Sequence, residues 1–165
     1  MPVDIVASGV RIPVGRKSFD FVIASHVIEH FFDPIHALEE WRRIARKYIF
    51  IICPQRDALE ADRSKALTTL QEITRRHKGE LHAPEIDDHQ HYSRWTSATF
   101  VQMCRYYGFS VARVQDPDDK VGNGFTIIID VAPSILSRVR GWWVSQMMKV
   151  RLKSAAALAP TALER

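Results

Sequence analysis

The sequence has few cysteines and no long apolar run. Its two cysteines, Cys53 and Cys104, each lie inside an apolar segment, which is typical of buried free thiols rather than of a disulfide framework. No apolar run approaches the roughly 20 residues that a membrane-spanning helix needs. The N-terminus MPVDIVASG also lacks the charged start and apolar segment of a secretion signal. Together these absences predict a cytoplasmic protein.

A strong charge of one sign is also missing, because the net charge is only +4. The basic residues gather after position 134, where a single acid, Glu164, accompanies Arg138, Arg140, Lys149, Arg151, Lys153 and Arg165. A nucleic-acid-binding surface over the whole domain is therefore not predicted, whereas a basic tail is.

Three short apolar runs, at residues 3–7, 19–24 and 48–53, have the composition of strands. Continuous rather than alternating apolar residues are typical of parallel strands that are covered on both faces. Between the second and third runs, Asp33 and Pro34 form the cap and first turn of a helix. A strand, a helix and a further strand make a right-handed crossover, so the sequence predicts an α/β domain.

The remaining chain predicts helices, a loop, a hairpin and a tail. Residues 58–77 have a weak helical stripe and are expected to cover the site, and residues 78–93 form a loop. A helix should begin after Thr96 and end at Gly108. Two strands, 109–115 and 125–131, follow without a helix between them and predict an antiparallel hairpin. The domain therefore covers residues 1–132, and residues 133–165 are a tail with a basic amphipathic helix at 138–153.

A polar cluster follows the second strand in the segment SFDFVIASHVIEH, residues 18–30. Ligands of open α/β sheets bind outside the carboxyl ends of the strands, so Ser25, His26, Glu29 and His30 are candidate binding residues. Glu29 and His30 could equally fix the helix that follows. A Ser-His-Glu nucleophile is not predicted, because no sharp Gly-x-Ser-x-Gly turn exposes the serine.

A second cluster contains His89 and His91 beside Asp87 and Asp88. These histidines are candidates for a general base with an orienting carboxylate, or for a loop held together by hydrogen bonds. No cysteine or third histidine lies nearby at a zinc-like spacing, so the sequence predicts no metal site.

Several of these segments resemble the class I S-adenosylmethionine-dependent methyltransferases, type 11. The resemblance rests on VDIVASG…IP at 3–13, FDFVIASHVIEHFFDP at 19–34 and IICP at 51–54. DDHQHYSRWT at 87–96 is similar to methyltransferase-like proteins found among bacterial glycan and cell-envelope biosynthesis genes. The resemblance implies a partial Rossmann-like three-layer sandwich that binds S-adenosyl-L-methionine. It also implies methyl transfer to a small-molecule or glycan acceptor.

The resemblance assigns roles to individual residues. Ser8 and Gly9, after the family's third strand, would lie near the adenine, and Ser25 with His26 would line the methionine end of the cofactor. Glu29 and His30 would close the pocket floor, and His89 or His91 would face the substrate as a base. The glycine-rich turn after the family's first strand has no counterpart, which implies that the first two strand–helix units are missing. The strand at 19–24 should then present a bare apolar edge that favours self-association.

Two further interpretations stay open. The chain could be an inactive remnant that acts as an interaction module through the bare edge and the tail. Residues 138–153 could lie on an anionic membrane surface, with tryptophans at the headgroup level, or could pack on the domain or on a partner.

Overall fold

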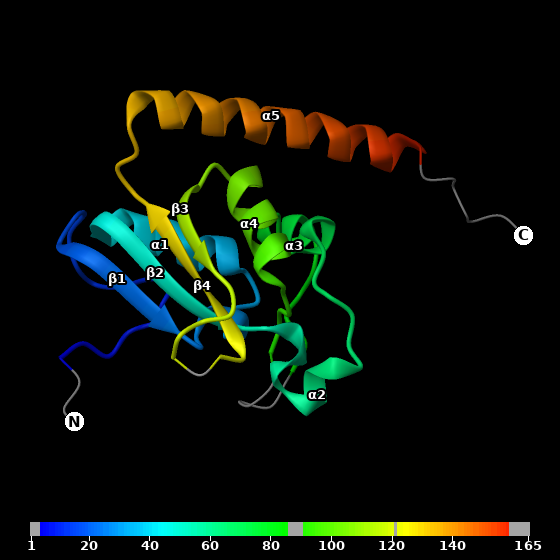
Figure 1. Ribbon diagram of the computed structural model, residues 1–165, viewed down its shortest axis with the longest axis horizontal. Helices are drawn as coiled ribbons and strands as arrows, with labels where there is room; N and C mark the ends of the chain where they lie inside the picture. Colours follow the sequence, from blue (N-terminus) through cyan, green and yellow to red (C-terminus); the bar gives the residue numbers. More distant parts are fainter. Residues whose placement is uncertain (1–3, 86–90, 121, 159–165) are drawn as a thin grey trace, which may run out of the picture.

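The computed structural model describes residues 4–85, 91–120 and 122–158 (Figure 1). The strands are β1 (Phe19–Ser25), β2 (Ala45–Pro54), β3 (Ser110–Gln115) and β4 (Gly124–Asp130). The α-helices are α1 (Pro34–Ile44), α2 (Glu60–Arg63), α3 (Leu70–His77), α4 (Ser97–Tyr106) and α5 (Ile135–Leu158). Two 3₁₀ turns, η1 (Ile28–His30) and η2 (Arg56–Ala58), follow β1 and β2.

The four strands form one sheet in the order β1-β2-β4-β3. β1 and β2 run parallel around the α1 crossover, whereas β4 is antiparallel to both β2 and β3. The predicted α/β fold, with its parallel crossover and its C-terminal hairpin, is therefore confirmed. The hairpin is not simply appended to the sheet, because β4 inserts between β2 and β3.

The hydrophobic core lies on one face of the sheet. Ile49, Ile51 and Ile127 alternate toward this face and are fully buried, as the two-residue period of strands requires. They pack in one cluster with side chains of α1 and α4, such as Leu38 and Phe100. Burial of one such side chain contributes about 1.5–3 kcal/mol relative to its exposed state, so this layer of helices supports the sheet from one side.

The opposite face carries apolar side chains that are much less covered. Phe21 and Ile23 of β1 pair with Tyr48 and Phe50 of β2 and therefore share one face. Phe21 is 54% exposed and Ile23 is 67% exposed. Within the described part of the chain, β1 has a partner strand on one side only. The predicted bare apolar edge is confirmed.

We expect Ile23→Lys to reduce concentration-dependent association without a loss of folded stability. A lysine at an edge strand disfavours pairing with a second chain, and the exposed isoleucine contributes little to the core. Sedimentation velocity over a concentration series measures the effect. The matched control is Val114→Lys, because Val114 is 43% exposed on β3, the strand at the opposite edge of the sheet. Equal effects of the two variants on association would show that β1 is not the associating edge.

Two local predictions are wrong. Residues 5–7 form no strand, because no described strand offers them backbone partners; Val6 is instead 91% exposed. The expected helix at 58–77 is divided into α2 and α3 by residues 64–69. The hydroxyl of Thr69 caps α3 by accepting a hydrogen bond from the Glu72 amide at 3.1 Å, which starts a new helix rather than continuing the old one.

The other helix boundaries agree with the sequence. Asp33 Oδ1 accepts hydrogen bonds from the amides of Ile35 at 3.1 Å and His36 at 3.2 Å, as an N-cap residue before Pro34 should. Thr96 caps α4 in a capping box. Gly108 follows α4 with a φ of 73°, a conformation that glycine adopts without steric cost.

α5 is longer than the predicted helix, and its apolar side chains are not confined to one face. Consecutive helical residues point about 100° apart, yet Trp142, Trp143 and Val144 are 57%, 59% and 41% exposed. The predicted one-sided stripe is therefore not observed. Ser145 Oγ donates a hydrogen bond to the Tyr106 carbonyl at 2.6 Å and ties α5 to α4.

Among the described residues no helix has the length and apolarity that crossing a bilayer requires. Contact of residues 138–153 with a membrane surface stays a prediction.

Candidate functional site

The candidate site begins where the chain leaves β1. The His26 amide donates to the Ile52 carbonyl at 2.8 Å and completes the parallel ladder. His26 then has a φ of 55°, which is uncommon for a residue with a Cβ and costs of order 1–3 kcal/mol. This turn directs the chain into η1 and brings His26, Glu29 and His30 to the carboxyl end of the sheet, as the sequence predicts.

Glu29 is the most unusual residue of the cluster. Its side chain is 1% exposed, and neither carboxylate oxygen has a hydrogen-bond partner. The Nδ1 atom of His26 lies 3.8 Å from Oε1. Burial raises the pKa of Glu29 to about 7, because a buried charge without a partner is strongly disfavoured.

His91 joins this cluster from a distant segment. Its Nδ1 lies 2.6 Å from Asp62 Oδ2, and the two side chains are 8% and 5% exposed. Burial lowers the pKa of His91, and this outweighs the opposing effect of Asp62. In the neutral ring Nδ1–H donates to the carboxylate, so Nε2 carries the lone pair.

Three of these side chains converge. The His30 and His91 rings meet edge to face with centroids 4.9 Å apart. One donor atom from each of Glu29, His30 and His91 lies within 4.8 Å of the other two. Two of the three residues are buried and His30 is exposed, so the cluster opens to solvent on the His30 side.

The segment that carries His91 is fixed to η1 by its backbone. The amides of Tyr92 and Ser93 both donate to the Glu29 carbonyl, at 3.0 and 3.2 Å. Arg76 of α3 holds the same segment, because its guanidinium donates to Ser93 Oγ and to the Tyr92 carbonyl, each at 2.9 Å. The position of His91 against Glu29 is therefore set by the fold rather than by a loose loop.

The β3–β4 turn closes another side of the site. Lys120 Nζ donates to Ser25 Oγ at 2.9 Å. Asp118 fixes the turn, since its Oδ2 accepts from the Gly124 amide at 2.7 Å. Burial, and secondly the Lys120 charge, lower the pKa of His26. A lysine and a histidine thus lie beside the Ser25 hydroxyl at the end of β1.

The structure brings together five of the predicted site residues and separates two others. Ser25, His26, Glu29, His30 and His91 share the carboxyl end of the sheet. Ser8 and Gly9 lie instead beside α1, where Trp41 Nε1 donates to the Gly9 carbonyl at 3.0 Å. His89 lies outside the described residues.

Sequence reasoning missed Asp62 and Lys120. Asp62 lies in the segment 58–77, which was predicted as one helix over the site, and Lys120 lies in the turn that joins the two strands of the predicted hairpin. The signal that could have identified Lys120 is topological, because a hairpin ending beside β2 returns its turn to the carboxyl end of the sheet.

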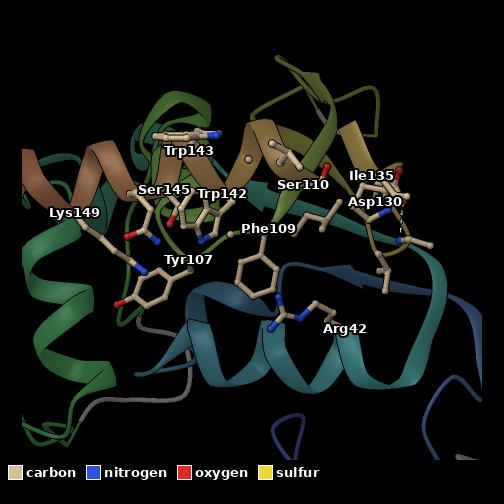
Figure 2. Close-up of a pocket in the computed structure, with 18 residues that line it drawn as sticks. Arg42, Tyr107, Phe109, Ser110, Asp130, Ile135, Trp142, Trp143, Ser145 and Lys149 are labelled. Atoms are coloured by element: carbon tan, nitrogen blue, oxygen red, sulfur yellow. Dashed lines mark hydrogen bonds between the residues drawn. The ribbon is translucent and has the colours of Figure 1, made fainter. Parts of the chain in front are cut away.

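A large cavity lies elsewhere. It has a volume of about 1230 Å³ and lies beneath α5, where Arg42, Phe109 and Asp130 line it (Figure 2). Trp142 and Trp143 of α5 are both among the residues that line it. Asp130 pairs with Tyr48 near the start of β2, so this cavity is at the amino end of that strand. We place the candidate site at the carboxyl end, where the titratable side chains gather.

Part of the chain resembles a known protein family. Residues 2–53 match a family described as "Methyltransferase domain". This segment contains β1, η1, α1 and almost all of β2, and therefore four of the five clustered residues. No curated protein matches the chain.

Solved structures resemble the chain at low identity. A chain from the complex of the Haloferax volcanii Trm112 methyltransferase activator with its candidate methyltransferase has a TM-score of 0.51 at 16% identity, and the match covers 81% of this chain and 64% of that one. A SAM-dependent methyltransferase from Aquifex aeolicus has a TM-score of 0.48 at 18% identity, covering 78% and 54%. The former likeness supports a Rossmann-like methyltransferase fold. This chain spans between about half and two thirds of the length of those proteins.

Proposed function

We propose that this chain takes part in S-adenosylmethionine-dependent methyl transfer, with the acceptor at the carboxyl ends of β1 and β2. One observation carries the proposal: the strand and turn that match a methyltransferase domain also present Ser25, His26 and Glu29 at that end of the sheet. An inactive interaction module is the less supported alternative, because it gives no role to these polar side chains.

The described residues fit one end of the cofactor. When bound, S-adenosylmethionine supplies an electrophilic methyl group on a sulfonium. The Lys120 ammonium, 2.9 Å from Ser25 Oγ, is suited to the carboxylate of its amino-acid end. None of the glycines in the described ranges follows a strand and opens a helix, so no turn there matches the family's glycine-rich loop. We therefore assign this chain one wall of the cofactor site.

His91 is the best candidate for activating the acceptor. Asp62 fixes its tautomer at 2.6 Å, and Nε2 can then accept a proton from an acceptor hydroxyl. Asp62 would stabilise the imidazolium that forms. A small-molecule or glycan hydroxyl is the acceptor that we propose. The same role for His89 stays a prediction.

We expect the purified chain to bind S-adenosylhomocysteine with a measurable heat in isothermal titration. Lys120→Met should weaken binding by about tenfold or more, since it removes one charge-assisted hydrogen bond worth roughly 1.5–3 kcal/mol. Lys78→Met, on a lysine that pairs with Glu80 at 3.6 Å, is the matched control. Absence of any binding to the wild-type chain would overturn the proposal, and equal losses in both variants would remove Lys120 from the site.

A further inference from the structure

We propose that Glu29, His30 and His91 bind one divalent transition-metal ion of the Zn²⁺ class. Asp62 is the outer partner of His91 in this site. Sequence spacing predicted no metal site, because the third ligand comes from a segment far along the chain. The fold brings that segment onto η1 through the bonds from Tyr92 and Ser93 to the Glu29 carbonyl.

The distances suit an ion of this kind. The three donor atoms lie within 4.8 Å of one another. In a tetrahedral site with bonds of about 2.0–2.1 Å, the ligand atoms lie roughly 3.3–3.5 Å apart. Small side-chain movements on ion binding would bring the three donor atoms to this spacing.

The unpartnered Glu29 carboxylate is the second and independent observation. Buried polar atoms in native proteins are nearly always hydrogen-bonded, and an exception needs a reason. Both oxygens of Glu29 are buried without a hydrogen-bond partner, and the His26 ring nitrogen at 3.8 Å from Oε1 is too distant to be one. A cation among these three side chains would supply the missing partner and offset the cost of burying the charge.

The Asp62–His91 pair has the arrangement of a metal ligand with its supporting residue. A histidine that binds a metal generally donates its other ring N–H to a carboxylate, which fixes the ring and raises its basicity. His91 makes this bond at 2.6 Å with both partners buried. Its remaining nitrogen, Nε2, is then the ligand atom.

The ligand set selects the class of metal. Two imidazoles and one carboxylate suit Zn²⁺, Co²⁺ or Fe²⁺, whereas Mg²⁺ and Ca²⁺ prefer oxygen ligands. Three protein ligands leave one coordination position open, as in catalytic sites. If the proposed function holds, an acceptor hydroxyl could occupy that position, and the ion would lower its pKa in place of the His91 base. Metal binding itself does not depend on methyl transfer.

The test uses protein freed of metal with a chelator and then desalted. ZnCl₂ titrated into the wild-type chain should bind one equivalent, and at least about tenfold more tightly than MgCl₂. Co²⁺ should give visible absorption bands of a four-coordinate site. Asp62→Asn should weaken Zn²⁺ binding by about 10–100-fold, and Glu29→Gln by at least as much. His77→Gln is the matched control, because His77 also pairs with an aspartate, Asp33, at 2.9 Å.

Three outcomes would overturn the site: less than half an equivalent of bound Zn²⁺, full binding by Glu29→Gln, or an equal loss in His77→Gln. Circular dichroism of each variant identifies any loss that comes from unfolding. Titration with S-adenosylhomocysteine separates the two proposals. Zn²⁺ binding without cofactor binding would overturn only the function, and the reverse result would overturn only the metal site.

Discussion

In the metal-free protein, the free energy of unfolding of the wild type should fall by about 2.5 kcal/mol relative to that of Glu29→Gln between about pH 5 and pH 8. Burial raises the pKa of Glu29 from 4.5 to about 7, so the folded state holds a proton that the unfolded state has released. The stabilising contribution is complete below the unfolded pKa. It is lost as the pH rises through the folded value, because the buried carboxylate must then ionise without a partner.

Comparison with the variant isolates Glu29 from its titratable neighbours. His26, His30, His91 and Cys53 also face the cluster, and the lowered pKa values of His26 and His91 act in the opposite direction as the pH rises. Urea unfolding at a series of pH values, with a chelator present, measures the difference. Glu85→Gln, at an exposed glutamate, should track the wild type. A constant difference between wild type and Glu29→Gln across this range would contradict an ionising Glu29.

Arg76→Met should lower the free energy of unfolding by about 3 kcal/mol or more. Arg76 is 8% exposed and donates to Ser93 Oγ and the Tyr92 carbonyl. It also pairs with Glu72 and lies over the Phe32 ring, 4.9 Å from its centroid. Methionine preserves the apolar stem but removes the donor to Ser93 Oγ, which is buried, and to the Tyr92 carbonyl.

Arg75→Met is the matched control for this prediction. Arg75 is the neighbouring residue on α3 and is 51% exposed in its pair with Glu80, so its loss should cost less than about 0.5 kcal/mol. Chemical denaturation of both variants gives the two values. Because Arg76 fixes the segment that carries His91, its variant should also weaken Zn²⁺ binding; equal stability of the two variants would show that the guanidinium contributes no net energy.

The sequence predicted the parts of the fold that depend on local chemistry. Asp33–Pro34, Thr96 and Gly108 act as helix boundaries in the structure because capping uses only neighbouring residues. The strand at 19–24 was recognisable from its apolar run. The strand predicted at 3–7 is not formed at residues 5–7. A strand needs a neighbouring strand for its backbone hydrogen bonds, and the composition of a five-residue segment does not indicate whether such a neighbour is present.

The candidate site was predictable only on the side where its residues are consecutive. Ser25, His26, Glu29 and His30 follow one strand, and the rule for open α/β sheets places them correctly. Asp62, Arg76 and Lys120 reach the site through the break after α2, the docking of α3 and the insertion of β4. These features depend on tertiary packing, which the periodicity of apolar residues in the sequence does not predict.

The sheet consists of two halves, each built from a different part of the chain, which meet where β4 lies beside β2. One half is β1, α1 and β2, and the other is α4, β3 and β4; the antiparallel ladder from Tyr48–Asp130 to Pro54–Gly124 joins their strands. The candidate site lies across the junction of the two halves, since Glu29 belongs to the first half and Lys120 to the hairpin of the second. The site is therefore complete only when the two halves are joined, and a local opening along this ladder would separate Lys120 from Ser25.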